Sequence, residues 1–479
     1  MNSGEIILQF DSGTLLLDGA DQSAQVPSPF QWDERVERWR APALFYRQAV
    51  EEIIRNKIPY KDQARRYHEF DFRATLDVEP WPYQQEAIDH WRRHGRRGVV
   101  ILPTGAGKTL VAQMAIKLTG RSTLVIVPTI DLMNQWYDLL LSSFAAEVGL
   151  IGAGYFELGA LTVSTYASAF RFMERMGNQF GLIIFDECHH LPGSAYRHAA
   201  EMAIAPFRLG LTATPERSDG SDGLLEELIG PIVYRREARE LAGGYLADYQ
   251  IVRINVHLSP QERARYQRER AIFRQFLDEH RIGLGSLQGW QMFINASARS
   301  EAGRRAMMAY RESKRIALGT DAKLRVLSTL LQRHRRDKVL IFTAENAAVY
   351  RISQQFLIPA ITHQTDIKER RQWLEAFNRG EVMAIATSKV LNEGVNIPDA
   401  SVAIVLSGSG SMREHVQRLG RILRKQPDKE AVLYEVVTVD TTEERISERR
   451  SGGEQFYDSG LKFETHRWVE SNSPEEPLE

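Results

Sequence analysis

Residues 103–109 read PTGAGKT, a composition that suits a loop binding phosphate groups. An apolar run, GVVIL (98–102), precedes this loop, and an amphipathic stretch, LVAQMAIKL (110–118), follows it. This order predicts a strand, a tight turn and a helix. Backbone N–H groups in such a turn, together with the positive end of the helix, favour an anion such as a nucleotide phosphate.

The side chains of this loop have separate roles in that chemistry. Gly105 and Gly107 permit the backbone to turn toward anionic oxygens. Lys108 can neutralise charge on the β- and γ-phosphates, and Thr109 can place a hydroxyl group on Mg²⁺. The strict pattern has glycine where this chain has Leu102, so a glycine-containing turn before an ordinary helix is the alternative. The strand–turn–helix context favours the phosphate loop.

A second candidate site follows the apolar run LIIF (182–185), where Asp186 and Glu187 are adjacent. Asp186 could hold Mg²⁺, often through water, and Glu187 could polarise the water that attacks a γ-phosphate. The structural alternative is a strand followed by an acidic helix cap. A Cys/His metal site at 188–190 is disfavoured, because these residues are adjacent and no second cluster stands at ligand spacing.

Alternating strand and helix patterns position these residues. Short apolar runs alternate with amphipathic stretches from about 84 to 235, and a second alternating block occupies 338–437. Such alternation predicts an α/β protein with parallel sheets covered by helices. The expected strands are 98–102, 123–127, 161–165, 182–185, 208–214, 338–343, 382–387, 401–407 and 431–437.

The other segments have different patterns. Within residues 1–25, IILQF and TLLLDG alternate on either side of Asp11-Ser12-Gly13, which is typical of a hairpin. Residues 33–56 predict a helix interrupted near Pro42. Residues 258–335 are rich in arginine and have helical spacing. We therefore expect a small N-terminal module (1–75), a first α/β domain (76–245), a basic helical insertion (246–335), a second α/β domain (336–450) and an acidic flexible tail (451–479).

Composition limits the function classes. The 479 residues include 61 Lys/Arg and 62 Asp/Glu, so the net charge is −1 and any nucleic-acid surface requires local charge segregation. A hydrophobic content of 43% excludes global disorder, and the single Cys188 excludes an intramolecular disulfide. No apolar run reaches the ~18 residues of a membrane span, and a basic secretory n-region is missing, so an internal soluble protein is expected.

The order of the motifs resembles that of superfamily 2 helicases and translocases. Four segments are similar to their motifs I, II, III and VI: PTGAGKT (103–109), DECHH (186–190), TAT (212–214) and QRLGRILR (417–424). Within that superfamily, WPYQQEAIDHW (81–91), LGLTATPER (209–217) and the arginine-rich insertion resemble compact XPB-type repair helicases. This resemblance implies two RecA-like parallel-sheet domains that hydrolyse ATP in the cleft between them and move 3′–5′ on DNA.

The resemblance also implies roles for individual residues. Nucleotide contacts are implied for Gln84 (adenine), Thr104, Gly105, Ala106, Gly107, Lys108, Thr109 and Gly394. Catalytic roles are implied for Lys108, Asp186, Glu187, Gln417, Arg421 and Arg424, the last three closing on the γ-phosphate as the domains meet. Thr109 and Asp186 would hold Mg²⁺, and Thr212 and Thr214 would couple the site to the DNA groove.

Three positions depart from the family pattern. XPB-type proteins have an Arg-Glu-Asp element after motif III, whereas Arg217 is followed here by Ser218 and Asp219, which puts the strand-separating role in doubt. Asn396 stands in motif V where an acidic residue is usual. Cys188 replaces a small residue of motif II and should be tolerated as a small hydrophobic side chain.

DNA contacts are expected from the basic insertion. Residues 261–340 hold 18 Lys/Arg and 8 Asp/Glu, an excess of positive charge that can follow phosphates. In XPB-type proteins this position holds a thumb-like insertion that grips DNA. Five aromatic residues are interleaved, and the core of an amphipathic bundle is the favoured place for most of them: Tyr266, Phe273, Phe276, Trp290 and Phe293.

Thr129, Thr165 and Thr387 lie in segments similar to DNA-contact motifs, although a helix cap or turn is an equal alternative for each. The run RRHGRR (92–97) is better explained as a solvated helix end than as a phosphate contact. The N-terminal module has too few motifs for us to assign damage recognition to it.

The sequence therefore predicts a DNA-dependent ATPase that acts as a helicase or translocase linked to DNA repair. Two alternatives remain: a duplex translocase or RNA-acting remodeller without strand separation, and an ATP-gated DNA clamp or scaffold with little turnover. The implied cofactors are ATP and Mg²⁺, and the implied partners are single-stranded or forked duplex DNA and a nuclease or repair complex. The expected location is the cytoplasm, associated with the nucleoid in a prokaryote.

Overall fold

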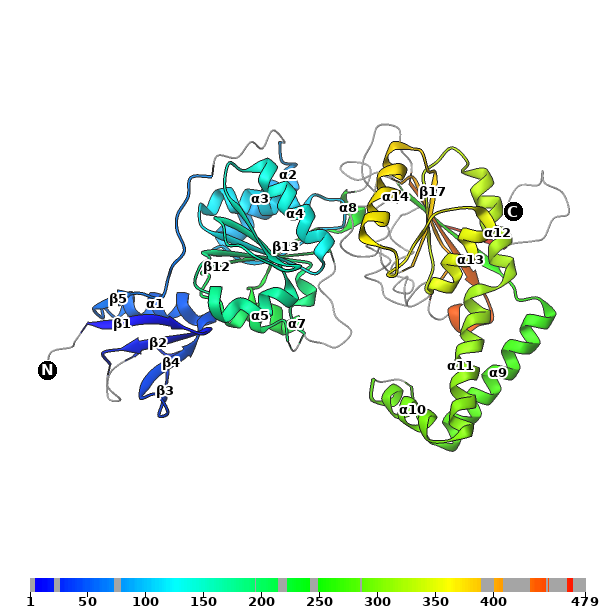
Figure 1. The fold of residues 1–479 in the computed structure, drawn as a ribbon, viewed down its shortest axis with the longest axis horizontal. Helices are drawn as coiled ribbons and strands as arrows, with labels where there is room; N and C mark the ends of the chain where they lie inside the picture. Colours follow the sequence, from blue (N-terminus) through cyan, green and yellow to red (C-terminus); the bar gives the residue numbers. More distant parts are fainter. Residues whose placement is uncertain are drawn as a thin grey trace. The chain divides into compact units, whose positions relative to one another are not determined.

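A computed structural model gives the structure of the chain (Figure 1). It describes residues 5–20, 26–72, 79–193, 195–213, 222–241, 249–284, 287–388, 400–407, 431–444, 447 and 463–467. The chain forms two compact units that divide after Leu241. The first unit contains the N-terminal module and one parallel sheet, and the second contains the helical region and another parallel sheet.

The N-terminal module is a five-stranded sheet in the order β3-β4-β2-β1-β5 with a helix beside it (Figure 1). Its elements are β1 (Ile6–Asp11), β2 (Thr14–Asp18), β3 (Gln31–Asp33), β4 (Arg38–Pro42), a 3₁₀ turn (Ala43–Phe45), α1 (Tyr46–Arg55) and β5 (Tyr60–Asp62). The predicted hairpin is confirmed: Ser12 and Gly13 have φ of 48° and 84°, the left-handed backbone that a two-residue turn requires. Asn178 Nδ2 donates to Ala64 O at 2.9 Å and ties the module to the next sheet.

The prediction of an interrupted helix over 33–56 is wrong before Pro42. Residues 31–42 instead form the hairpin β3–β4, and β4 also pairs with β2. The rings of Trp32 and Trp39 pack edge to face across this hairpin, 5.6 Å apart, and Glu37 adopts a φ of 51° in its turn. Cross-strand packing of this kind outweighs the weak helical spacing of the charged residues.

The first parallel sheet has eight strands in the order β13-β6-β12-β11-β7-β10-β8-β9, of which β9 alone runs antiparallel to its neighbour. This order places the ends of β6, β12 and β11 side by side, so the residues that follow these strands meet at one edge. Its elements are α2 (Pro82–Arg93), β6 (Arg97–Ile101), α3 (Lys108–Thr119), β7 (Thr123–Val127), α4 (Ile130–Ser143), β8 (Val148–Gly152), β9 (Tyr155–Phe156), β10 (Leu161–Thr165), α5 (Tyr166–Met176), β11 (Leu182–Asp186), a 3₁₀ turn (Cys188–His190), α6 (His198–Glu201), β12 (Phe207–Thr212), α7 (Asp222–Leu228), β13 (Ile232–Arg235) and α8 (Ala238–Leu241).

A fully buried arginine holds the opposite, amino-terminal edge of this sheet. The guanidinium group of Arg208 donates four hydrogen bonds of 2.6 to 3.2 Å to main-chain carbonyl groups: those of Ala200, Ala203, Ala205 and Leu228. These bonds connect β12 to the segment before it and to the end of α7.

Arg208→Met is expected to lower the free energy of unfolding by about 3 kcal/mol, because it leaves several buried carbonyl groups without a donor. Urea denaturation followed by fluorescence would measure the loss, with the exposed Arg93→Met of α2 as the control. A loss no greater than that of the control would show that water replaces the guanidinium group.

The second unit has a seven-stranded sheet in the order β16-β17-β15-β18-β19-β14-β20, and its described strand pairs are parallel. All nine strands expected for the two blocks are confirmed. The elements are β14 (Tyr249–Val256), α9 (Pro260–Glu279), α10 (Leu287–Arg299), α11 (Glu301–Gly319), α12 (Asp321–Arg333), β15 (Val339–Phe342), α13 (Asn346–Phe356), β16 (Ala360–Ile361), α14 (Ile367–Arg379), β17 (Ala384–Thr387), β18 (Val402–Val405), β19 (Ala431–Thr438) and β20 (Phe463–Arg467).

The helical region of this unit is an antiparallel pair, α9 and α11, that carries α10 at its far end (Figure 1). The expected core role of most of its aromatic residues is confirmed, since Tyr266, Phe273, Phe276 and Phe293 are buried. Within the range 246–335 expected for the insertion, β14 pairs in the second sheet and α12 packs into that sheet's core. In the range expected for the tail, β20 pairs with β14.

Candidate nucleotide-binding and catalytic site

The phosphate loop connects the end of β6 to the start of α3. Gly105 and Gly107 have φ of 86° and 72°, which turns the backbone before the helix begins at Lys108. Lys108 Nζ donates to Leu102 O at 3.2 Å, which leaves two of the three ammonium hydrogens for phosphate oxygens. Thr104 Oγ1 is buried and has no hydrogen-bond partner within the described residues. A bound phosphate would satisfy it, so these residues fit a nucleotide.

Gln84 lies against this loop and is buried. Its Nε2 donates to Ala106 O at 2.9 Å, and its Oε1 accepts from Trp81 N at 2.9 Å. A Cβ atom at Gly107 would overlap Gln84 Nε2, so glycine is required there for a second reason. The adenine-recognition role of Gln84 stays a prediction, because both ends of its amide already bond within the protein.

Asp186 ends β11 and is nearly buried. Its Oδ2 accepts from Trp136 Nε1 of α4 at 2.8 Å, and its Oδ1 accepts from the backbone N–H of Glu187 at 3.0 Å. Burial raises the pKa of Asp186, while the Trp136 hydrogen bond and the positive charge of Lys108 act to lower it. Sequence reasoning gave Trp136 no role, because it lies 50 residues from Asp186, although it ends the segment VPTIDLMNQW (127–136), which is similar to motif Ia.

A chain of polar contacts links Glu187 to Thr212. His189 is buried, and its Nδ1 lies 3.0 Å from Thr212 Oγ1 and 3.4 Å from Glu187 Oε2. Glu187 itself has φ 48° and ψ 52°, a strained conformation for a residue with a side chain. His189 therefore contacts both the last residue of β12 and the residue that follows β11. The sequence motifs suggested this histidine only as a metal ligand.

Trp136→Phe is expected to raise the Mg²⁺ concentration for half-maximal ATP hydrolysis about 10-fold, because Asp186 loses a hydrogen bond that supports its charged form. Without that donor the pKa of Asp186 rises further, so the acidic limb of the pH–rate profile should move to higher pH. Magnesium titrations and pH–rate profiles would measure both changes. The neighbouring Tyr137→Phe is the control, and equal profiles for the two variants would contradict the supporting role of Trp136.

The three threonines predicted to contact DNA lie at the ends of strands. Thr129 Oγ1 accepts from Leu132 N and caps α4, and Thr165 Oγ1 accepts from Ser168 N and caps α5. Thr387 is buried and bonds to Ser388 O. The capping alternative thus applies to two of them, and their DNA contacts stay predictions.

Several predicted site residues lie outside the described residues. These are Thr214, Gly394, Gln417, Arg421 and Arg424, together with the departures at Ser218, Asp219 and Asn396. In the described residues, no group of three His, Cys, Asp or Glu side chains could hold a metal ion.

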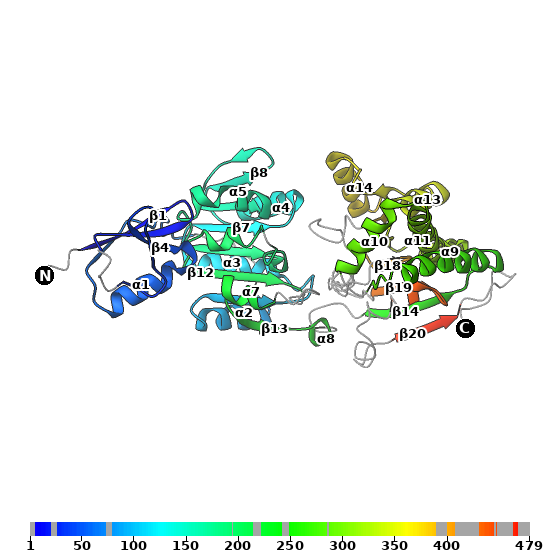
Figure 2. The ribbon, with the colours of Figure 1, turned by 90° about the horizontal axis from the view of Figure 1, so that it is seen from below.

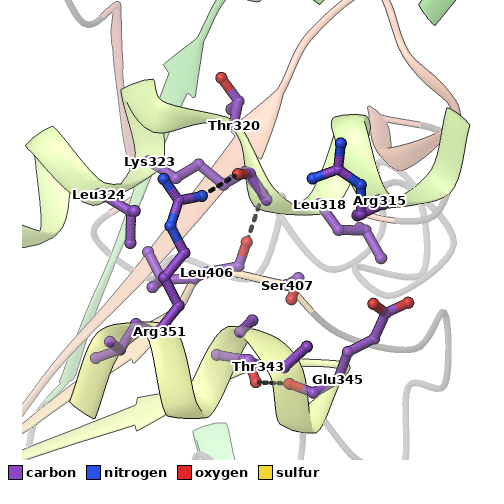
Figure 3. Close-up of a pocket in the computed structure, with 14 residues that line it drawn as sticks. Arg315, Leu318, Thr320, Lys323, Leu324, Thr343, Glu345, Arg351, Leu406 and Ser407 are labelled. Carbon is purple, nitrogen blue, oxygen red and sulfur yellow. Dashed lines mark hydrogen bonds between the residues drawn. The ribbon is translucent and has the colours of Figure 1, made fainter. Parts of the chain in front are cut away.

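A separate pocket of about 130 Å³ lies in the second unit, where α11 ends and α12 and α13 begin (Figure 3). Its walls are mostly apolar, and Arg315, Arg351 and Glu345 line it as well. Lys323 is buried behind it and bonds to Leu406 O and to both carboxylate oxygens of Glu443. The ammonium group of Lys323 is thus engaged in bonds within the protein, unlike that of Lys108, which makes one described bond.

Family models match three parts of the chain. Residues 8–64 match the Xeroderma pigmentosum group B helicase damage recognition domain, 77–217 match the type III restriction enzyme res subunit, and 305–472 match the ERCC3/RAD25/XPB C-terminal helicase. The match to residues 8–64 covers the N-terminal module, to which the sequence motifs gave no role. This module has no short motif that would reveal its family.

Relatives match over most of the chain. The DNA 3′-5′ translocase XPB2 of Sulfurisphaera tokodaii is 40% identical over 446 residues, which cover 93% of this chain and 99% of that protein. The DNA 3′-5′ helicase XPB of Mycobacterium tuberculosis is 32% identical, covering 78% of this chain and 64% of that protein. A structure of Saccharomyces cerevisiae Dbp5 with RNA and ADP BeF3 has a TM-score of 0.55 at 13% identity, covers 89% of this chain and 94% of that one, and shows the fold alone.

The phosphate loop, the acidic pair and the two parallel sheets define an ATP-driven enzyme of the superfamily 2 helicase class. Within that class, the chain belongs to the XPB/Rad25 family. No helix among the described residues is long and apolar enough to cross a membrane.

Proposed function

We propose that this protein is a DNA 3′–5′ translocase and helicase of DNA repair that is driven by ATP hydrolysis. The observation that carries the proposal is the 40% identity to an XPB2 translocase over 93% of the chain. The small N-terminal sheet, matched by the damage recognition model, would contact DNA beside the motor.

In the proposed mechanism Lys108 and the turn at 105–107 hold the β- and γ-phosphates. Asp186 and Thr109 supply oxygen ligands of the kind that Mg²⁺ prefers, and the metal would neutralise charge that develops on the phosphates. Glu187 would orient and deprotonate the attacking water. Arg421 and Arg424 would close on the γ-phosphate, where their planar, permanently charged groups suit the transition state.

The proposal is tested by ATP hydrolysis without nucleic acid and with single-stranded DNA, forked DNA or RNA. Stimulation by DNA but not by RNA, together with strand displacement on forks, is the expected result. Negligible hydrolysis by folded protein that still binds ATP and DNA would instead favour the gated clamp.

Translocation on duplex DNA without strand separation is the second candidate. Ser218 in place of the acidic residue of the Arg-Glu-Asp element favours it. Displacement of a triplex-forming strand from blunt duplex DNA, without unwinding of forks, would select this candidate. Restoring the acidic residue with Ser218→Glu should then produce fork unwinding.

Acting on DNA places the protein inside the cell, and we propose a cytoplasmic, nucleoid-associated location in a prokaryote. A nuclease or a larger repair complex is the proposed protein partner, by analogy with the family.

A further inference from the structure

A surface at the outer edge of the first parallel sheet has no part in the nucleotide site. The hairpin of β8 and β9 forms it together with α5, and both lie at the same end of the sheet in Figure 2. Three large apolar side chains of the hairpin are exposed, Tyr155 at 56%, Phe156 at 39% and Leu158 at 45%. Gathered exposure of this kind marks an interaction site rather than a core.

One face of α5 continues this surface. Ser168, Arg171, Phe172 and Arg175 follow the cap Thr165 at helical spacings of three and four residues, so they share a stripe. The ring of Phe172 packs against that of Phe156 with centroids 5.0 Å apart. The stripe therefore faces the hairpin.

The two arginines of the stripe are held by the rings. The guanidinium carbon of Arg175 lies 5.0 Å from the centroid of Phe156, and that of Arg171 lies 5.3 Å from the centroid of Phe172. Within the described residues neither arginine forms an ion pair. A guanidinium group supported on a ring keeps its N–H donors for an outside acceptor and loses little side-chain entropy on binding.

Acidic side chains do not cancel these charges. Glu174 stands three residues after Arg171 and directly before Arg175, and Glu157 follows β9. Both carboxylates are exposed. They reduce the electrostatic attraction of an anionic partner but form no ion pair with the two arginines.

The position of the hairpin favours a nucleic-acid strand. Thr129 caps the helix after β7, and Thr165 caps the helix after β10. In the sheet the next strand outward is β8, whose last residue, Gly152, pairs with Tyr155. A Cβ atom at Gly152 would lie 3.1 Å from Ser168 Oγ, so the turn packs directly on the first turn of α5. A strand that crosses the two threonine caps reaches Tyr155 next.

We propose that Tyr155, Arg171 and Arg175 extend the DNA track of the first domain beyond its motifs. The arginines bind successive phosphates, and the Tyr155 ring stacks on a base or sugar without reading sequence. This inference rests on the proposed function, since it assumes that DNA crosses the carboxyl edge of this sheet.

The test is the affinity of the full chain for fluorescein-labelled single-stranded and forked DNA, measured by anisotropy over a series of salt concentrations. Arg171→Gln combined with Arg175→Gln should weaken binding about 10-fold and make the salt slope for single-stranded DNA shallower by about 1.4, since each phosphate contact contributes about 0.7. Tyr155→Ser should weaken binding about 5-fold or more and leave the slope unchanged, because stacking releases no counterions.

Two controls keep the result specific. Arg371→Gln combined with Arg379→Gln removes two exposed arginines from α14, and Glu174→Gln removes an exposed carboxylate beside the two arginines of α5. Neither should weaken binding, and all variants should melt within a few degrees of the wild type, as exposed substitutions do.

The outcomes separate this inference from the proposed function. If DNA stimulates ATP hydrolysis by the wild type but the Arg171/Arg175 and Tyr155 variants bind DNA like the controls, the inference is overturned and the surface is left to a protein partner. If no DNA stimulates the wild type, the proposed function itself fails.

Discussion

Lys108→Ala is expected to lower kcat for DNA-stimulated ATP hydrolysis by about 10³-fold. Removing a charge that stabilises the transferring phosphate costs this much in sites of the same chemistry. Lys108 is the first residue of α3, and among the described residues its ammonium group bonds only to Leu102 O. The substitution therefore removes a charge from the site and leaves the loop's own contacts at Tyr83, Gln84 and Ala106 in place.

The measurement is a steady-state ATPase assay with saturating single-stranded DNA. Lys117→Ala is the matched control, because Lys117 is exposed in the last turn of the same helix. Both variants should retain the thermal stability of the wild type. Hydrolysis by Lys108→Ala within a few-fold of the Lys117→Ala rate would mean that ATP is hydrolysed elsewhere, and the loop at 103–109 would lose its assigned role.

The loop at 103–109 and the acidic pair at 186–187 could be placed at strand ends from the sequence because their signals are local. In PTGAGKT and DECHH, the residue types at a few consecutive positions indicate the chemistry. Each motif directly follows an apolar run, which places it at the end of a strand. The parallel order of the strands then brings Lys108 and Asp186 together at one edge.

Contacts between distant segments could not be predicted in the same way. The Trp136–Asp186 hydrogen bond and the attachment of Gln84 to Ala106 depend on how helices pack against the sheet. The hairpin β3–β4 was mistaken for a helix because its charged residues have helical spacing, whereas pairing with β2 decides its structure. The strand β14 was overlooked because its pairing partners, β19 and β20, follow it by more than 170 residues.

Glu187→Gln is expected to lower kcat by about 10³-fold while ATP still binds. General base catalysis contributes roughly 10² to 10⁴, and an amide cannot take a proton from water. Glutamine keeps the size of the side chain, and the left-handed backbone at φ 48° strains both residues alike. The phosphate loop is untouched, so the affinity for ATP should change by no more than a few-fold.

Equilibrium binding of a fluorescent ATP analogue, together with single-turnover hydrolysis, separates these two effects. Glu157→Gln, which changes an exposed carboxylate just after β9, is the control. Because hydrolysis is blocked after ATP binds, the Glu187→Gln protein should also remain in its ATP-bound state and show the DNA affinity of that state for longer. Equal loss of binding and hydrolysis would instead indicate a damaged nucleotide pocket.

The contact between Glu187 and His189 allows a second explanation for the loss of hydrolysis in the Glu187→Gln variant. Glu187 could act by holding His189, and through it Thr212, rather than by taking a proton. In that case Thr212→Val, which removes the hydroxyl group at the far end of the contact, would reproduce the loss of hydrolysis. If Glu187 is the base, Thr212→Val should retain most of the DNA-independent hydrolysis and lose only its stimulation by DNA, because β12 would no longer be coupled to the acidic pair.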